Sequence, residues 1–151
     1  MARMHSRKRG ISKSTRPYRK ETPKWVELPE NEIKKVIINL GKKGASPSLI
    51  GVTLRDQYGV PSTKLMTKKR ITEILKENKI APELPEDLMN LIRTSVALDK
   101  HRTANLQDMT AKRGMQLVEA KINRLTKYYA REGRIPADWK YDLAKAKLLV
   151  R

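Results

Sequence analysis

Lysine and arginine side chains, by their number and spacing, are the groups in this chain best suited to bind a ligand. Six of them lie outside an apolar stripe between residues 108 and 131: Lys112, Arg113, Lys121, Arg124, Lys127 and Arg131. Guanidinium and ammonium groups in such numbers bind phosphate oxygens without reading sequence. The pattern therefore predicts that this segment contacts a polyanion.

Groups that could catalyse a reaction are sparse. The chain has no cysteine and two histidines, His5 and His101, which excludes disulfides, Cys-ligated zinc and thiol catalysis. It contains no glycine-rich phosphate loop and no HExxH or GxSxG pattern, so the usual catalytic motifs are missing. We expect a protein that is not an enzyme and that binds no cofactor, metal or small-molecule substrate.

The positive charge is concentrated toward the two ends of the chain. Of the formal net charge of +18 over 151 residues, residues 1–24 carry +8, residues 25–90 carry +2 and residues 91–151 carry +8. A surface charged only for solubility would not be divided in this way, whereas two regions that contact nucleic acid around a packing module would be.

Residues 1–24 lack apolar periodicity, and we expect an extended basic tail that orders on its partner. A solvated arm without a ligand is the alternative. Nine cations against one acid in this segment favour contacts with phosphate, with one tyrosine available for stacking. The expected contact residues are Arg7, Lys8, Arg9, Arg16, Tyr18 and Arg19.

Residues 25–80 are predicted to form a small helical module. The spacing of apolar residues predicts a helix over 30–40, a second that Ser46 caps with Pro47 at its first position, and a third near Thr67 that continues through Leu75. Because the segment is nearly neutral, we interpret it as a packing module. A basic DNA- or chromatin-binding protein that uses residues 46–60 for recognition is the main alternative.

Residues 81–151 are predicted to form a C-terminal domain of three helices, over about 86–103, 108–131 and 137–149. The second is the most regular, with an apolar stripe at steps of three and four residues: Met115, Val118, Ile122, Leu125 and Tyr129. No alternation typical of β-strands appears, so the expected fold class is all-α.

A membrane partner is the third possibility. A helix with one basic and one apolar face could lie on an anionic membrane, but neighbouring helices could also cover this stripe, and no apolar run reaches the roughly 20 residues of a spanning helix. The basic start lacks the apolar segment of a signal peptide. We therefore expect a cytoplasmic protein without a membrane partner.

Several segments resemble the small-subunit ribosomal protein S-fifteen family, in its archaeal and eukaryotic branch (eukaryotic S-thirteen type). They are residues 4–7 (MHSR), 46–56 (SPSLIGVTLRD), 81–88 (APELPEDL) and 101–108 (HRTANLQD), followed by Ala111 to Gly114 and by Arg124 to Tyr128. Their order and spacing span nearly the whole chain. The resemblance implies a structural constituent of the small ribosomal subunit, a monomer there, which contacts small-subunit rRNA and neighbouring ribosomal proteins.

The resemblance also implies two RNA-binding sites. The first lies at the turn between the two long helices, where His101, Asn105, Asp108 and Ala111 occupy the family's positions and would read the shallow minor groove of an RNA helix. Ala111 lacks the hydroxyl of the family's pattern, and helical steps of four, three and three residues would align all four along one edge.

The second site, at a three-way junction in the central domain of the rRNA, maps onto Arg124 and Tyr128. Arginine would pair with phosphate while tyrosine stacks on a base or sugar. Tyr129 falls on the apolar stripe and is predicted to be core. The proline-rich segment 82–85 replaces a glycine-containing loop of bacterial members, so their contact there is not expected.

Overall fold

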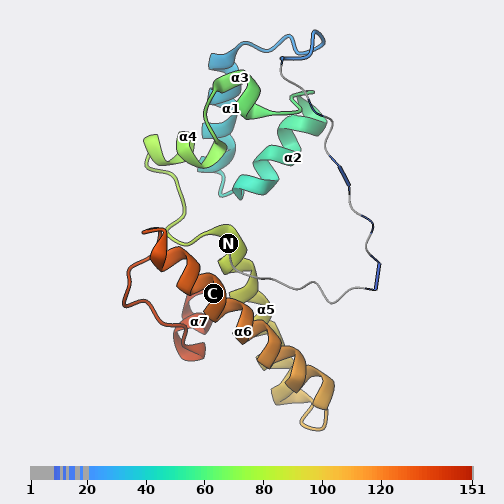
Figure 1. The fold of residues 1–151 in the computed structure, drawn as a ribbon, viewed down its shortest axis with the longest axis vertical. Coiled ribbons are helices and arrows are strands. Elements are labelled where there is room, and N and C mark those ends of the chain that lie inside the picture. Colours follow the sequence, from blue (N-terminus) through green and yellow to red (C-terminus); the bar gives the residue numbers. More distant parts are fainter. Residues whose placement is uncertain (1–8, 11, 13, 16–17, 19–20, 151) are drawn as a thin grey trace. The chain divides into compact units, whose positions relative to one another are not determined.

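All regular elements of the described chain are helices (Figure 1). The computed structural model describes residues 9–10, 12, 14–15, 18 and 21–150. Within them the helices are α1 (Glu30–Lys42), α2 (Pro47–Gln57), α3 (Thr63–Thr67), α4 (Ile71–Glu77), α5 (Glu86–Ala104), α6 (Met109–Arg131) and α7 (Leu143–Leu149). The predicted all-α fold class is confirmed.

Two compact units divide the chain, and each has its own core. The described residues between Ile11 and Pro82 form the N-terminal unit, and those from Glu83 onward form the bulk of the C-terminal unit. The predicted boundaries of a tail over 1–24, a module over 25–80 and a domain over 81–151 stay a prediction. No helix precedes Glu30 in the residues that the structure describes.

Aliphatic side chains build the core of the N-terminal unit. Full burial of one such side chain stabilises the fold by about 1.5–3 kcal/mol relative to leaving it in water. As predicted, Ser46 caps α2, its hydroxyl oxygen accepting from the Leu49 backbone N–H at 3.3 Å. The core residues of the N-terminal unit are Ile33, Ile37, Ile50, Leu54, Val60, Ile74 and Leu75.

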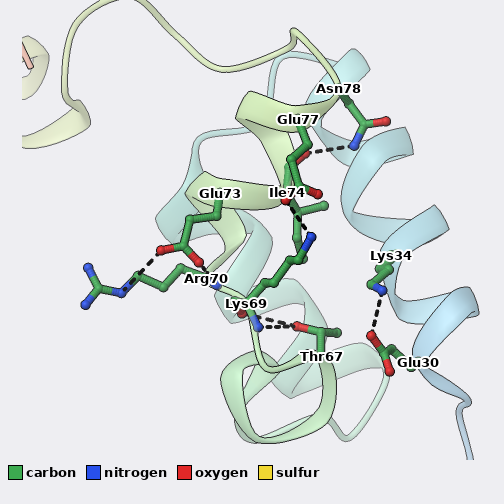
Figure 2. Close-up of polar contacts among 9 residues, drawn as sticks. All are labelled: Glu30, Lys34, Thr67, Lys69, Arg70, Glu73, Ile74, Glu77 and Asn78. Carbon is green, nitrogen blue, oxygen red and sulfur yellow. Dashed lines mark hydrogen bonds and ion pairs between the residues drawn. The ribbon is translucent and has the colours of Figure 1, made fainter.

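The prediction of one helix from about Thr67 through Leu75 is wrong, because two short helices occupy this part of the chain. Lys68 has a left-handed backbone with φ of 59°, and this conformation ends α3. Figure 2 shows Glu73 at the start of α4, where its carboxylate accepts from the Arg70 backbone N–H at 2.8 Å. Such a contact satisfies a donor that lacks a helical partner and so begins a new helix.

The C-terminal unit is built on a hairpin of two long helices. Helices α5 and α6 run antiparallel and pack along their length, and α7 packs on α5 (Figure 1). The buried face of α5 includes one polar residue, Ser95, next to Val96, which is 5% exposed. The core residues here are Leu88, Ile92, Val96, Ile122, Leu125, Tyr129, Ile135 and Ala146.

The last helix is shorter than predicted, Leu143–Leu149 instead of 137–149. Asp142 has an extended backbone, and its carboxylate accepts from the Ala144 backbone N–H at 3.1 Å, so the helix begins after it. The preceding Tyr141 hydroxyl lies 2.7 Å from the hydroxyl of fully buried Ser95. That hydrogen bond fixes a non-helical segment against α5.

Candidate nucleic-acid interface

Helix α6 has an apolar face in the core and a basic face in solvent. Its outward cations are exposed except for Lys121, which is half-buried. With 3.6 residues per turn, Arg113, Arg124 and Lys127 fall opposite the buried stripe. The basic face of α6 consists of Lys112, Arg113, Lys121, Arg124, Lys127 and Arg131, as the sequence predicted.

None of these six cations forms an ion pair with another described residue. Arg113 donates to the Gln116 side-chain oxygen at 3.1 Å, and the Arg124 Nε donates to the Ala120 carbonyl at 3.1 Å. The latter contact orients the guanidinium and leaves its terminal nitrogens for a ligand. The face is therefore a set of positive charges without internal compensation, which suits phosphates.

Arg124 and Tyr128 lie four residues apart on α6, one turn along the same side. Arg124 is exposed, whereas Tyr128 is half-buried, with its ring centroid 5.1 Å from that of Tyr129 at an interplanar angle of 57°. This tilted contact restrains the Tyr128 ring. The structure thus brings the two residues predicted for the junction site to one stretch of α6.

Tyr129 lies in the core, as predicted. It is 8% exposed, and its hydroxyl donates to the Asp87 carboxylate at 2.6 Å, a contact between α6 and the first turn of α5. Burial, together with this hydrogen bond, raises the pKa of Tyr129 above its ordinary value. The hydroxyl therefore stays a neutral donor that holds the two helices in register.

The turn between α5 and α6 carries a closed hydrogen-bond network. Asp108 caps α6, and its Oδ1 accepts from the Ala111 backbone N–H at 2.9 Å and from the Thr110 hydroxyl at 2.6 Å. Its Oδ2 lies 2.9 Å from the His101 Nε2. The Asn105 amide nitrogen lies 3.3 Å from the His101 Nδ1 and donates to the His101 carbonyl at 3.1 Å.

These hydrogen bonds keep the Asp108 carboxylate ionised. Donation from Thr110, from the Ala111 backbone and from His101 lowers the pKa of Asp108 below its ordinary value. A carboxylate that accepts several hydrogen bonds is stabilised in its charged form.

The prediction that helical steps align the four turn residues along one edge is wrong. Helix α5 ends at Ala104, Asn105 is its C-cap, and Asp108 is the N-cap of α6. The structure nevertheless brings His101, Asn105 and Asp108 into contact. Ala111 is 8% exposed and lies in the core, so its side chain is not part of that set.

Three exposed residues of the turn were not singled out from the sequence. Leu106 is 87% exposed, Met109 is 65% exposed, and Thr110 is exposed with its hydroxyl bonded to Asp108. The signal for Thr110 was its place two residues after a capping aspartate. No local pattern distinguishes Leu106 or Met109 from core residues.

Two of the six contact residues predicted in the N-terminal tail are described. Arg9 is exposed, and Tyr18 is 86% exposed and so accessible for stacking. The other four, Arg7, Lys8, Arg16 and Arg19, lie outside the described residues.

The segment 46–60, the recognition element of the DNA-binding alternative, holds helix α2 and a single cation, Arg55. The Arg55 Nε donates to the neighbouring Asp56 carboxylate at 2.7 Å. This hydrogen bond raises the pKa of Arg55 and lowers that of Asp56. A helix whose cation is neutralised by the next residue offers little attraction to a phosphate backbone.

Membrane-spanning helices and metal-binding clusters are both absent from the described part of the chain. No helix there is long and apolar enough to cross a bilayer. Over the same residues, no three His, Cys, Asp or Glu side chains gather where they could hold a metal ion.

Comparison with known proteins gives full-length similarity. Residues 1–60 match the family model described as the ribosomal S13/S15 N-terminal domain, and residues 71–149 match that of ribosomal protein S15. Relatives named small ribosomal subunit protein uS15 are 48% identical in Methanoculleus marisnigri, 47% in Methanospirillum hungatei and 45% in Methanocella arvoryzae. Each alignment covers 150 residues, 99% of this chain and 99% of the relative.

Proposed function

This chain belongs to the S15 family of small ribosomal subunit proteins, and we propose that it binds the central domain of small-subunit rRNA at a three-way junction and at the adjacent helix. It is a ribosomal protein and not an enzyme, in agreement with the expectation from the sequence. The observation that carries the RNA proposal is the basic face of α6, whose six cations have no ion-pair partner among the described residues.

Binding would proceed through a few contacts of different kinds. Exposed cations of α6 neutralise phosphates and release their counterions, which supplies affinity without base selectivity. Arg124 adds a contact in fork geometry at the junction, and Tyr128 adds stacking on a base or sugar. The turn between α5 and α6 faces the minor groove of the adjacent helix.

The consequence for the ribosome would be architectural. RNA helices that converge on a junction sample several arrangements, and a rigid protein that binds one of them shifts the population toward it. Helices α5 and α6 supply that rigidity, because they share a core and the Tyr129–Asp87 hydrogen bond. The chain would act as a monomer beside neighbouring ribosomal proteins in the cytoplasm.

The test replaces Arg124→Ala together with Tyr128→Ala in the full chain. Lost stacking and one lost phosphate contact should weaken binding of the junction RNA by about ten-fold or more and reduce the slope of log affinity against log salt by roughly one unit. Filter binding or fluorescence anisotropy over a salt series measures both quantities.

Arg55→Ala together with Tyr58→Ala is the matched control, because it removes the same two side-chain types from the N-terminal unit. This control should bind the junction RNA as the unmodified protein does. Unchanged affinity and slope in the Arg124 and Tyr128 variant would contradict the proposed site. A preference for duplex DNA would favour the alternative through residues 46–60, and liposome binding that survives RNase would favour a membrane partner.

A further inference from the structure

The hydrogen of the Thr110 hydroxyl is already used in a hydrogen bond within the turn. It lies 2.6 Å from the Asp108 Oδ1, and an ionised carboxylate can only accept, so Thr110 must be the donor. A hydroxyl carries one hydrogen and two lone pairs. Once the hydrogen points at Asp108, the exposed oxygen can only accept a hydrogen bond from a ligand.

The other polar groups of the turn are largely consumed by one another. Both His101 ring nitrogens have partners, Nε2 with Asp108 and Nδ1 with the Asn105 amide nitrogen. Both Asp108 carboxylate oxygens accept hydrogen bonds within the turn. What the polar network still offers to a ligand is a set of acceptors: the Thr110 hydroxyl oxygen, the Asn105 side-chain carbonyl and the second lone pair of the Asp108 Oδ2, which accepts only from His101.

We propose that Thr110 is a specificity-determining residue, whose hydroxyl oxygen accepts a hydrogen bond from a donor in the minor groove of the bound RNA helix. This inference rests on the proposed function and adds one named atom to the contacts that the turn would make with RNA. Two donors occur in that groove, the ribose 2′-hydroxyl and the exocyclic amine of guanine. Phosphate oxygens only accept, so the Thr110 hydroxyl oxygen cannot bind a phosphate there.

The arrangement separates two tasks within the C-terminal unit. The cations of α6 bind acceptors, the phosphates, whereas the free side-chain oxygens of the hydrogen-bonded turn residues bind donors. His101 and Asp108, which the family resemblance places in contact with RNA, also orient Thr110, because Asp108 accepts from both the His101 ring and the Thr110 hydroxyl. The missing hydroxyl at Ala111 is compensated by the hydroxyl one residue earlier.

The test measures binding of Thr110→Val, Thr110→Ser and Thr94→Val to an RNA fragment that contains the junction and the adjacent helix. Valine keeps the shape of threonine without the oxygen, and loss of one hydrogen bond should weaken binding about five-fold. Serine should restore it. Thr94 is the matched control, since its exposed hydroxyl donates to the Asn90 carbonyl elsewhere on α5.

The RNA side identifies the donor without changing the protein. Single 2′-deoxy substitutions remove one ribose hydroxyl each, and inosine for guanosine removes the amine. One such change should weaken binding of the unmodified protein about five-fold. On that RNA, Thr110→Val should cause no further loss of affinity. Whether a deoxy or an inosine position shows this non-additivity tells which donor Thr110 contacts.

Amide exchange at Ala111 and the Tm show whether the turn of each variant stays folded. Wild-type affinity for Thr110→Val, or no modified RNA that weakens binding of the unmodified protein, would overturn the inference while the proposed function stands. If the unmodified protein does not prefer the junction fragment over an unrelated RNA of equal length, the proposed function itself fails.

Discussion

At the scale of single residues, Asp108 determines the local structure of the turn. Its carboxylate accepts from a hydroxyl, a backbone N–H and an imidazole, so it caps α6 and holds the end of α5 at once. These donors lower its pKa from the ordinary value. A group whose pKa is lowered on folding stabilises the fold above its unfolded pKa, and this contribution is lost as the pH falls through the folded pKa.

Asp108→Asn is therefore expected to lower the Tm at pH 7 and to do so less as the pH falls. Asparagine can still cap a helix but carries no charge. The unfolded pKa is about 4, so the Tm difference should be constant above that pH and shrink below it. Thermal unfolding followed by circular dichroism from pH 7 downward measures it. Asp138→Asn, at an exposed position outside the helices, is the control, and a pH-independent difference would contradict the argument.

At the scale of elements, close packing between α1 and α4 explains a glycine inside a helix. The sequence pattern predicted a first helix over 30–40, but α1 runs through Gly41 to Lys42. A Cβ at this position would lie 2.6 Å from the Leu75 Cδ2, which is in the core. Gly41 thus serves the approach of two helices.

Gly41→Ala is expected to destabilise the protein, although replacing glycine with alanine inside a helix normally stabilises the helix by about 1 kcal/mol. Displacement of buried Leu75 should cost about 1–3 kcal/mol, which exceeds that gain. Gly114→Ala in α6 is the matched control, because its Cβ would meet nothing within 4 Å, and it should be stabilising. Urea unfolding of both variants gives the sign, and a stabilising Gly41→Ala would show that Leu75 can move freely.

At the scale of the whole molecule, the described residues form two cores, one in each unit. One consists of residues from α1 to α4 and the other of residues from α5 to α7 and the segment between α6 and α7. Ile37 and Ile122 are fully buried, one in each. Because each core is built within its own unit, a defect in one core should act first on that unit.

Ile122→Ala is expected to lower the stability of the C-terminal unit by about 2–5 kcal/mol, the usual cost of such a truncation. Ile37→Ala should do the same in the N-terminal unit. Native-state amide exchange of the full chain measures the protection of backbone amides in both units in one experiment. Each variant should lose protection in its own unit and keep it in the other, whereas equal loss in both would mean that the chain unfolds as one cooperative block.

Much of the architecture could be predicted from local sequence. The all-α class, the cap at Ser46, the extent of α6 and the core position of Tyr129 depend on spacing and on residues near in sequence, which a linear pattern contains. Charge counting likewise located the basic face of α6. These features arise from interactions within one or two helical turns.

The tertiary structure decided what depends on partners distant in sequence. Tyr141 leaves the helical path to reach Ser95, 46 residues away, so the last helix starts late. The turn brings His101 into hydrogen-bond contact with Asp108, seven residues later in the chain. The Thr110 hydroxyl donates its hydrogen to the same Asp108 carboxylate. Which atoms stay free for a ligand follows from these contacts, because a hydrogen bond depends on where the fold brings donor and acceptor together.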